Sequence, residues 1–145
     1  MTGDSSGHTS FWDVRTGTLI TSHKSHGADV LALYVDMAHG VYSAGVDNTL
    51  VLFRLVQQEW TPVWHSRVHS HDIRAVTVVD RHVISGSVDG TVHIGHMEKL
   101  LQREKGASLR IRQWRKCISF CDAKRWFVHA DTHFVRVWQL ASGTQ

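Results

Sequence analysis

Two groups of residues have the types and the order that a hydrolase could use. Each group joins a histidine, a serine and an aspartate, and in both the aspartate follows the serine by four residues. The groups are His26, Ser43 and Asp47, and His69, Ser85 and Asp89. A hydrolase would use Ser85 as its nucleophile and His69 as the base that takes the hydroxyl proton. Because catalysis needs one pocket and this set recurs, we predict that the protein is not an enzyme.

Two clusters imitate metal sites. The first has the side chains of a two-cysteine, two-histidine zinc site, namely Cys117, Cys121, His129 and His133. Only seven residues separate Cys121 from His129, whereas a zinc finger places about 12 there. The second cluster, His65, His69 and His71, could bind a metal or sense pH, but we expect a loop that joins two repeats. The sequence therefore predicts no metal and no cofactor.

A basic segment between residues 103 and 125 holds eight Lys or Arg residues against two acidic ones, although the whole chain has a net charge of only +3. Trp114 and Trp126 are interleaved with the cations. RNA-binding proteins use cations for phosphates and aromatic rings for bases; the alternative is a solvated surface with packed tryptophans. The candidates for contact with RNA or an acidic partner are Arg103, Lys105, Arg110, Arg112, Arg115, Lys116, Lys124 and Arg125.

Short strands are expected to position the histidine, serine and aspartate residues. Val83–Ser87 and Thr91–Ile94 flank Asp89-Gly90, a dipeptide that favours a two-residue hairpin turn. A similar hairpin is expected at residues 41–55, and the spacing from Asp47 to Asp89 is 42 residues. The apolar run Val30–Val35 is typical of a strand buried on both faces.

The composition is that of a globular domain, with 42% hydrophobic residues and one proline in 145 residues. The sequence contains no apolar run of membrane-spanning length and no signal-peptide pattern. Since only two cysteines are present, no disulfide framework is expected, and a reducing intracellular compartment is the default. We predict no membrane partner and no small-molecule substrate.

Strands that repeat every 40–45 residues are typical of a β-propeller, in which each repeat forms one small antiparallel sheet, or blade. The chain resembles the WD-repeat β-propeller family, and within it the scaffold proteins of the small-subunit processome. The residues that carry this resemblance are Phe11–Asp13, Thr16–Leu19, Ser22-His23, Ala28–Val30, His71–Arg74, Ile84–Gly86, Met97–Lys99, Cys117–Ser119 and Val137–Leu140. The expected fold is all-β, a partial propeller of about three to four blades of four-stranded antiparallel sheet.

The resemblance assigns a structural role to the two polar groups. Family members use these positions for a buried hydrogen-bond network that joins the outer turns to the strands. His26, Ser43 and Asp47, and their counterparts His69, Ser85 and Asp89, would form such networks. The fourth member in the family is a tryptophan, but Phe53 and Gly95 stand at these positions here. We therefore expect both networks to lack an indole donor.

Two alignments are open for the last third of the chain. The first keeps a spacing of 41 to 43 residues between four equivalent positions, which are Trp12, Phe53, Gly95 and Trp138. The second aligns Ser119 with Ser43 and Ser85 and makes Lys116–Cys121 the second strand of a blade. The resemblance favours the second alignment. The expected organisation is consecutive blades over 1–96 with the first incomplete, a junction over 97–108 that could include a helical turn, and a further blade over 109–145 that could open a second propeller.

The resemblance implies a non-catalytic scaffold that acts in small-subunit biogenesis and pre-rRNA processing in the nucleolus, within the nucleus. Its expected partners are other proteins of the processome, with pre-ribosomal RNA as a candidate contact. Since a closed propeller needs at least four blades, we expect the chain to be a fragment of a longer protein. The alternatives are an adaptor in another complex, such as a ubiquitin ligase, and, more remotely, the Ser/His/Asp hydrolase.

Overall fold

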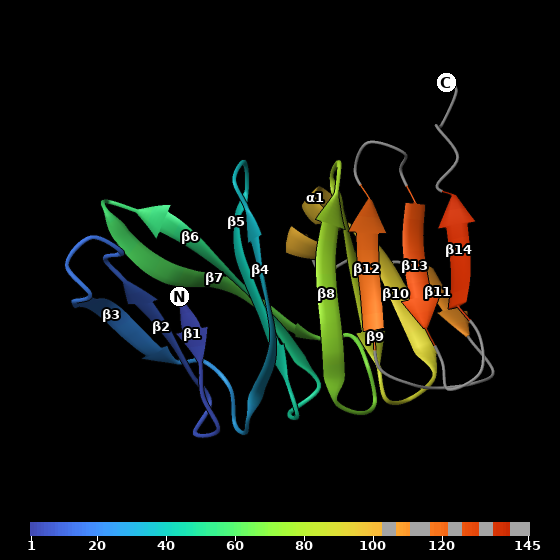
Figure 1. Ribbon diagram of the computed structural model, residues 1–145, viewed down its shortest axis with the longest axis horizontal. Coiled ribbons are helices and arrows are strands. Elements are labelled where there is room, and N and C mark those ends of the chain that lie inside the picture. Colours follow the sequence, from blue (N-terminus) through green and yellow to red (C-terminus); the bar gives the residue numbers. More distant parts are fainter. Residues whose placement is uncertain (103–106, 111–116, 122–125, 131–134, 140–145) are drawn as a thin grey trace.

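The computed structural model describes residues 1–102, 107–110, 117–121, 126–130 and 135–139 (Figure 1). These residues form four antiparallel sheets and one short helix. The chain is therefore all-β in character, and its sheets have the form of consecutive propeller blades. Among the described residues, the helix is far too short and too polar to cross a membrane.

Two of the sheets have three strands and two have four. The first sheet, in the order β1-β2-β3, comprises Thr2–Gly3, His8–Trp12 and Leu19–Lys24. The second, β4-β5-β6-β7, comprises Val30–Asp36, Gly40–Gly45, Thr49–Val56 and Glu59–Arg67. The third, β8-β9-β10-β11, comprises Ile73–Val79, His82–Ser87, Thr91–His96 and Ala107–Arg110. The fourth, β12-β13-β14, comprises Cys117–Cys121, Trp126–Ala130 and Val135–Gln139.

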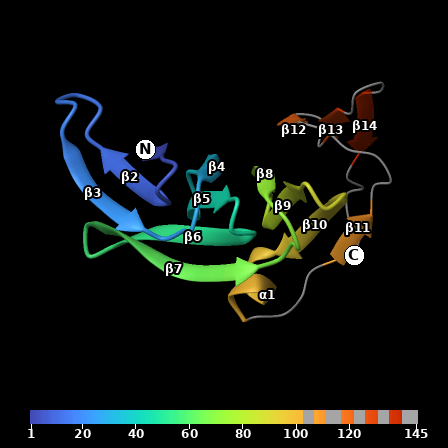
Figure 2. The same cartoon turned by 90° about the horizontal axis from the view of Figure 1, so that it is seen from below.

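Consecutive sheets pack side by side in the order of the chain. Strand β4 lies beside β8, and β8 lies beside β12, so the first strands of three sheets stand in succession (Figures 1 and 2). This succession places β12 as the first strand of the fourth sheet and β14 as its third. Phe53, Gly95 and Trp138 consequently all lie in third strands, β6, β10 and β14, while Trp12 lies in β2, the middle strand of the three-stranded first sheet.

That equivalence decides between the two alignments of the last third. The favoured alignment, with Lys116–Cys121 as a second strand, is wrong, and the alignment that keeps a spacing of 41 to 43 residues holds. Residues 109 and 110 belong to the third sheet, because β11 pairs with β10 through Thr91↔Arg110 and Val92↔Leu109. A boundary at residue 109 would cut this strand. The division of the chain at 97–108 stays a prediction.

The β9–β10 hairpin turn is one residue longer than its sequence suggested. Strand β9 ends at Ser87 and β10 begins at Thr91, which leaves a three-residue loop. Only the last loop residue is left-handed, namely Gly90 with φ of 81° and its counterpart Asn48 with φ of 55°. A turn closed by one left-handed residue is the usual solution for three-residue hairpins, and it leaves the aspartate free to accept hydrogen bonds.

Apolar burial is greatest in the middle strands of the second sheet. Residues 41–45 of β5 and 49–53 of β6 are all buried, because the first and third sheets cover both faces. The expectation that Val30–Val35 is buried on both faces is wrong, since Leu31 and Val35 are exposed. Strand β4 is the first strand of its sheet, and its outer neighbour in the first sheet is the two-residue β1.

The outer strand of the second sheet is an element that sequence reasoning missed. Residues 59–67 form β7, so His65 lies in a strand and not in the expected loop. Their alternation of polar and apolar residues is short and is interrupted by Pro62, which fits an outer strand. The expected helical turn near Met97 is present as α1, Met97–Leu101. Met97 and Leu100 of this helix join the main core.

Candidate functional site

Two polar networks lie at equivalent corners of the second and third sheets. In the first, Nδ1 of His26 lies 3.0 Å from Oδ1 of Asp47. Because a carboxylate can only accept, this nitrogen donates. Nε2 of the same ring lies 2.6 Å from the hydroxyl of Ser43, and the backbone N–H of Gly27 donates to Asp47 over 2.8 Å. The network thus ties the loop before β4 to the β5–β6 turn.

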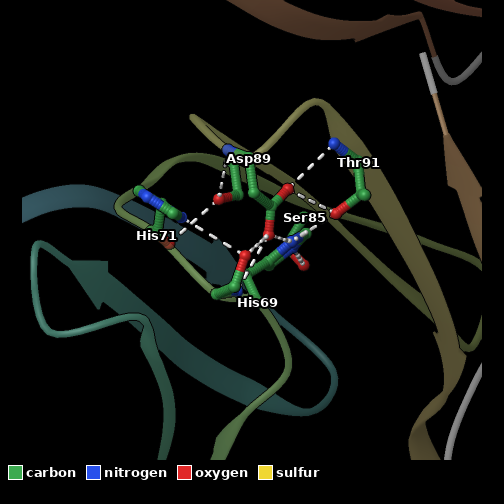
Figure 3. A network of polar contacts seen from close by, with 7 residues as sticks. His69, His71, Ser85, Asp89 and Thr91 are labelled. Atoms are coloured by element: carbon green, nitrogen blue, oxygen red, sulfur yellow. Dashed lines mark hydrogen bonds and ion pairs between the residues drawn. The ribbon is translucent and has the colours of Figure 1, made fainter. Parts of the chain in front are cut away.

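The second network has the same members in a different arrangement (Figure 3). Nε2 of His69 lies 2.9 Å from the Ser85 hydroxyl, but its Nδ1 lies 2.9 Å from the hydroxyl of Thr91. Thr91 donates its own hydroxyl proton to Oδ1 of Asp89 over 2.6 Å. Nδ1 of His69 is 3.4 Å from Oδ2 of Asp89. The threonine hydroxyl therefore stands between the histidine and the aspartate.

The hairpin explains why the aspartate reaches so many donors. As the middle residue of a three-residue loop, Asp89 accepts from the backbone N–H of Thr91, two residues on, over 2.9 Å. It also accepts from the backbone N–H and the hydroxyl of Ser70, over 2.8 and 3.2 Å. Asp47 likewise accepts from the backbone N–H of Thr49 over 3.1 Å. A local turn thus presents a carboxylate to a distant loop.

Burial and hydrogen bonding set the charge states of these groups. Burial opposes ionisation of Asp89, but the donors from Thr91 and Ser70 outweigh it and lower its pKa to about 2. The pKa of Asp47 is also lowered, because the N–H of Gly27, the His26 ring and Thr49 outweigh its burial. Burial lowers the pKa of His69, and the charge of Asp89 only partly offsets this. His69 is therefore neutral at pH 7, and its Nε2 accepts the Ser85 proton.

The geometry does not suit hydrolysis at either serine. A nucleophilic hydroxyl must reach a substrate carbonyl, whereas Ser43 is 0% exposed and Ser85 is 1% exposed. Each hydroxyl is held against a histidine inside the sheet stack. What the arrangement does well is to satisfy buried polar groups while it fastens a loop to a hairpin.

The threonines were not singled out in the sequence, although they follow the aspartates at a constant spacing of two residues. Thr49 and Thr91 both donate their backbone N–H to the aspartate. Only the Thr91 hydroxyl also contacts the histidine; the Thr49 hydroxyl donates to the backbone oxygen of Asp47 over 3.2 Å. The repeated Asp-x-Thr pattern in the sequence was the signal that could have identified both.

Phe53 and Gly95, which occupy the family's tryptophan positions, are used for packing. The Phe53 ring meets that of Phe11 at 5.4 Å and that of His23 at 5.9 Å, so it joins the second sheet to the first. Gly95 lies under α1, where an added Cβ would come within 2.6 Å of Leu100. A tryptophan at residue 95 would collide with the helix as it is packed.

The other predicted sites are only partly described. Of the basic candidates, Arg110 lies in β11 with only its backbone described, and the other seven lie outside the described residues. Cys117, Cys121 and His129 lie in β12 and β13, where His129 pairs with Ile118, and His133 lies outside the described residues. His65 lies on β7, apart from His69 and His71 in the loop before β8. The side chains that the structure describes contain no metal-binding cluster.

The described sheets define the class of protein as a partial β-propeller. No protein-family model matches the sequence. The fold is shared with the computationally designed Ika8 protein, at a TM-score of 0.76 and 24% identity over 95% of this chain and 42% of that one. It is also shared with a chain of the Mitotic Checkpoint Complex, at a TM-score of 0.78 and 16% identity over 96% of this chain and 44% of that one.

Curated relatives with a common name match almost the whole sequence. The chain is 31% identical to the human U3 small nucleolar RNA-associated protein 4 homolog, over 96% of this chain and 22% of that protein. It is 27% identical to U3 small nucleolar RNA-associated protein 4 of Saccharomyces cerevisiae, over 97% of this chain and 20% of that protein. The Schizosaccharomyces pombe protein of the same name is 29% identical over 98% of this chain. The chain spans about a fifth of the length of these relatives.

Proposed function

We propose that this chain is a non-catalytic WD-repeat scaffold that acts in small-subunit biogenesis and pre-rRNA processing in the nucleolus. The observation that carries the proposal is its similarity, over 96% of its length, to a protein named for association with U3 small nucleolar RNA. The residues that resemble cirhin, a processome component, support the same assignment. Its partners would be other proteins of the small-subunit processome.

The structure supports a scaffold through its rigidity. Each network fastens a loop to a hairpin with hydrogen bonds of 2.6–3.0 Å between its histidine and the adjoining side chains. Loops held in this way lose little conformational entropy when a partner binds, so they keep their binding geometry in the free protein. Burial of both serines supports a role without catalysis.

Two finer parts of the proposal concern the last third of the chain. The basic candidates from Arg103 to Arg125 would contact pre-ribosomal RNA or an acidic partner. The residues that follow β11 would contribute a further blade, which could open a second propeller. A phosphate contact of this kind would weaken steeply with salt.

The test is recovery of the tagged chain from cells. We expect it to co-purify with U3 small nucleolar RNA and early ribosomal precursors, measured by hybridisation against a tagged, unrelated propeller. Recovery at the level of that control, with the tagged chain shown to be folded, would contradict the proposal. Recovery with a ubiquitin ligase instead would favour the adaptor.

A further inference from the structure

Ser70 is an exposed member of the second polar network. It belongs to the β7–β8 loop, and Asp89 faces this loop from the β9–β10 hairpin (Figure 3). The Ser70 hydroxyl donates to Oδ2 of Asp89 over 3.2 Å, and its backbone N–H donates to the same oxygen over 2.8 Å. One carboxylate oxygen therefore accepts from both the main chain and the side chain of an exposed residue.

The first network has no hydroxyl at the equivalent position. Gly27 stands 43 residues before Ser70, and its backbone N–H donates to Asp47 over 2.8 Å. The contact from the backbone is thus present in both networks, and the hydroxyl is an addition in the second. A serine hydroxyl can be phosphorylated, whereas glycine offers no such group. The second network can therefore be modified at a point where the first cannot.

An exposed arginine, Arg67, ends β7 three residues before Ser70. Protein kinases with an acidic substrate cleft select an arginine at this spacing, because the guanidinium pairs with their carboxylates. Two threonines in the described part of the chain also follow an arginine by three residues, namely Thr18 and Thr77. Thr77 is only 5% exposed, and the Thr18 hydroxyl pairs with that of Thr16 inside an exposed turn. Of these three hydroxyls, that of Ser70 is both exposed and bonded to a network.

A phosphate on Ser70 would conflict with the carboxylate beside it. Asp89 is ionised at neutral pH, because its hydrogen bonds lower its pKa to about 2. A phosphoserine carries a charge of about −1.5 to −2 at pH 7, and its oxygens are acceptors. Phosphorylation therefore puts a repulsive anion where the hydroxyl now donates over 3.2 Å.

The loop must leave the hairpin for a short time before Ser70 can react. The adjacent residue His69 is 7% exposed and is hydrogen-bonded to Ser85 at 2.9 Å, whereas a protein kinase binds its substrate as an extended chain. Loops of folded proteins open locally in this way. Once Ser70 is phosphorylated, closing brings the phosphate toward Asp89, so the open form is favoured.

We propose that Ser70 is a phosphorylation site, and that its phosphorylation weakens the attachment of the β7–β8 loop to the β9–β10 hairpin. The phosphoryl donor is ATP, and the enzyme is a kinase that selects arginine three residues before the serine. A bond forms between Oγ of Ser70 and the γ-phosphorus as the bond from that phosphorus to ADP breaks. The hydroxyl proton passes to the base of the kinase. This corner of the protein would thereby switch between a fastened and a released loop.

The first test is phosphorylation of the purified chain, with the catalytic subunit of cyclic-AMP-dependent protein kinase and magnesium ATP as probes. The Thr18→Val variant removes the other exposed candidate, and tandem mass spectrometry locates the phosphate. We expect it on Ser70. Arg67→Gln should slow labelling at least about tenfold, whereas Arg74→Gln, an exposed arginine on the other side of Ser70, should leave the rate unchanged. A thermal melt checks that both variants are folded.

The second test measures how firmly the loop is attached, by hydrogen exchange of matched amides. The N–H of Val88 donates to the backbone oxygen of Asp72 over 2.9 Å, and its counterpart Val46 donates to Asp29 over 3.0 Å. Phosphorylation should speed exchange at Val88 by at least about tenfold and leave Val46 unchanged.

Two variants separate the effect of charge from the loss of the hydroxyl bond. Ser70→Gly reproduces the arrangement at Gly27, so it should take no phosphate there and should keep the Val88 amide protected. In Asp89→Asn, phosphorylation should speed exchange much less than in the unmodified chain, because the carboxylate charge is gone.

Three results would overturn the proposal. The first is absence of phosphate on Ser70 under conditions that fully label a serine peptide with arginine at the same spacing. The second is equal labelling rates for Arg67→Gln and the unmodified chain. The third is unchanged exchange of the Val88 amide after phosphorylation. None of these results depends on recovery of ribosomal precursors, so this proposal and the scaffold function can fail separately.

Discussion

The two polar networks share their residue types but differ in how the histidine reaches the aspartate. His26 contacts Asp47 directly at 3.0 Å, whereas His69 reaches Asp89 through the hydroxyl of Thr91. Asp89 consequently accepts four hydrogen bonds from Ser70 and Thr91. The same sequence pattern can therefore form two different hydrogen-bond arrangements. In the arrangement around Asp89, the carboxylate accepts more hydrogen bonds than the carboxylate of Asp47 does.

The largest expected difference lies in removal of the carboxylates. Asp89→Ala should lower the free energy of unfolding by about 3 kcal/mol, because several donors at the hairpin lose their acceptor. Asp47→Ala should cost about 2 kcal/mol, because fewer donors depend on it. Denaturant unfolding of both variants measures the difference.

The matched control for these variants is Asp72→Ala. Asp72 pairs through its side chain with the exposed Arg74 at 3.2 Å, so its removal should cost less than about 1 kcal/mol. Equal losses for Asp47→Ala and Asp89→Ala would show that the extra donors of the second network add nothing to stability.

Acidification should affect the second network in two steps. The pKa of Asp89 is lowered to about 2 in the folded chain, so its contribution is full above pH 4 and is lost as the pH falls toward 2. The expected loss is about 2 kcal/mol. The pKa of His69 is lowered too, so its neutral form stabilises the fold above about pH 6.5 and this contribution declines below it.

Unfolding measured between pH 7.5 and about 2 checks this dependence. His93 must be controlled, because its ring lies 6.1 Å from that of His69 and its pKa is lowered by burial and by His69. In His93→Gln the loss of stability below pH 4 should persist. In Asp89→Asn the loss of stability below pH 4 should be smaller. An unchanged loss in that variant would refute the assignment to Asp89.

Gly95, which stands where family members have a tryptophan, gives a prediction of intermediate size. Gly95→Ala should destabilise the chain by about 1–2 kcal/mol, because its Cβ would meet Leu100 at 2.6 Å. In the background of Leu100→Ala the same substitution should cost much less. A double-mutant cycle measures this coupling, and strict additivity of the two changes would contradict the proposed contact.

The threonines give the smallest and sharpest contrast. Thr91→Val removes a hydroxyl that links His69 to Asp89, and we expect a loss of about 1 kcal/mol. Thr49→Val removes only a bond to a backbone oxygen and should cost no more than about half as much. Thermal unfolding of the two isosteric variants compares them directly. A larger loss of stability for Thr49→Val than for Thr91→Val would contradict the described difference between the two networks.

Much of the fold was predictable because its signals are local. The hairpin around Asp89 was evident from β-branched residues on either side of a turn dipeptide, and its copy around Asp47 confirmed the repeat. The turn length was wrong because a two-residue and a three-residue hairpin use similar residues. The outer strand β7 was missed because an edge strand has weak alternation and tolerates proline.

The sequence by itself determined the strand repeat and the positions of the six residues of the polar networks, since hairpins and their turns depend on neighbours in the chain. Only the tertiary structure decided that β12 is a first strand, that α1 covers Gly95 and that Thr91 stands between His69 and Asp89. These outcomes depend on packing between sheets and on differences of a few tenths of an ångström between donors and acceptors. Such distances arise from contacts between residues far apart in sequence, which no local pattern specifies.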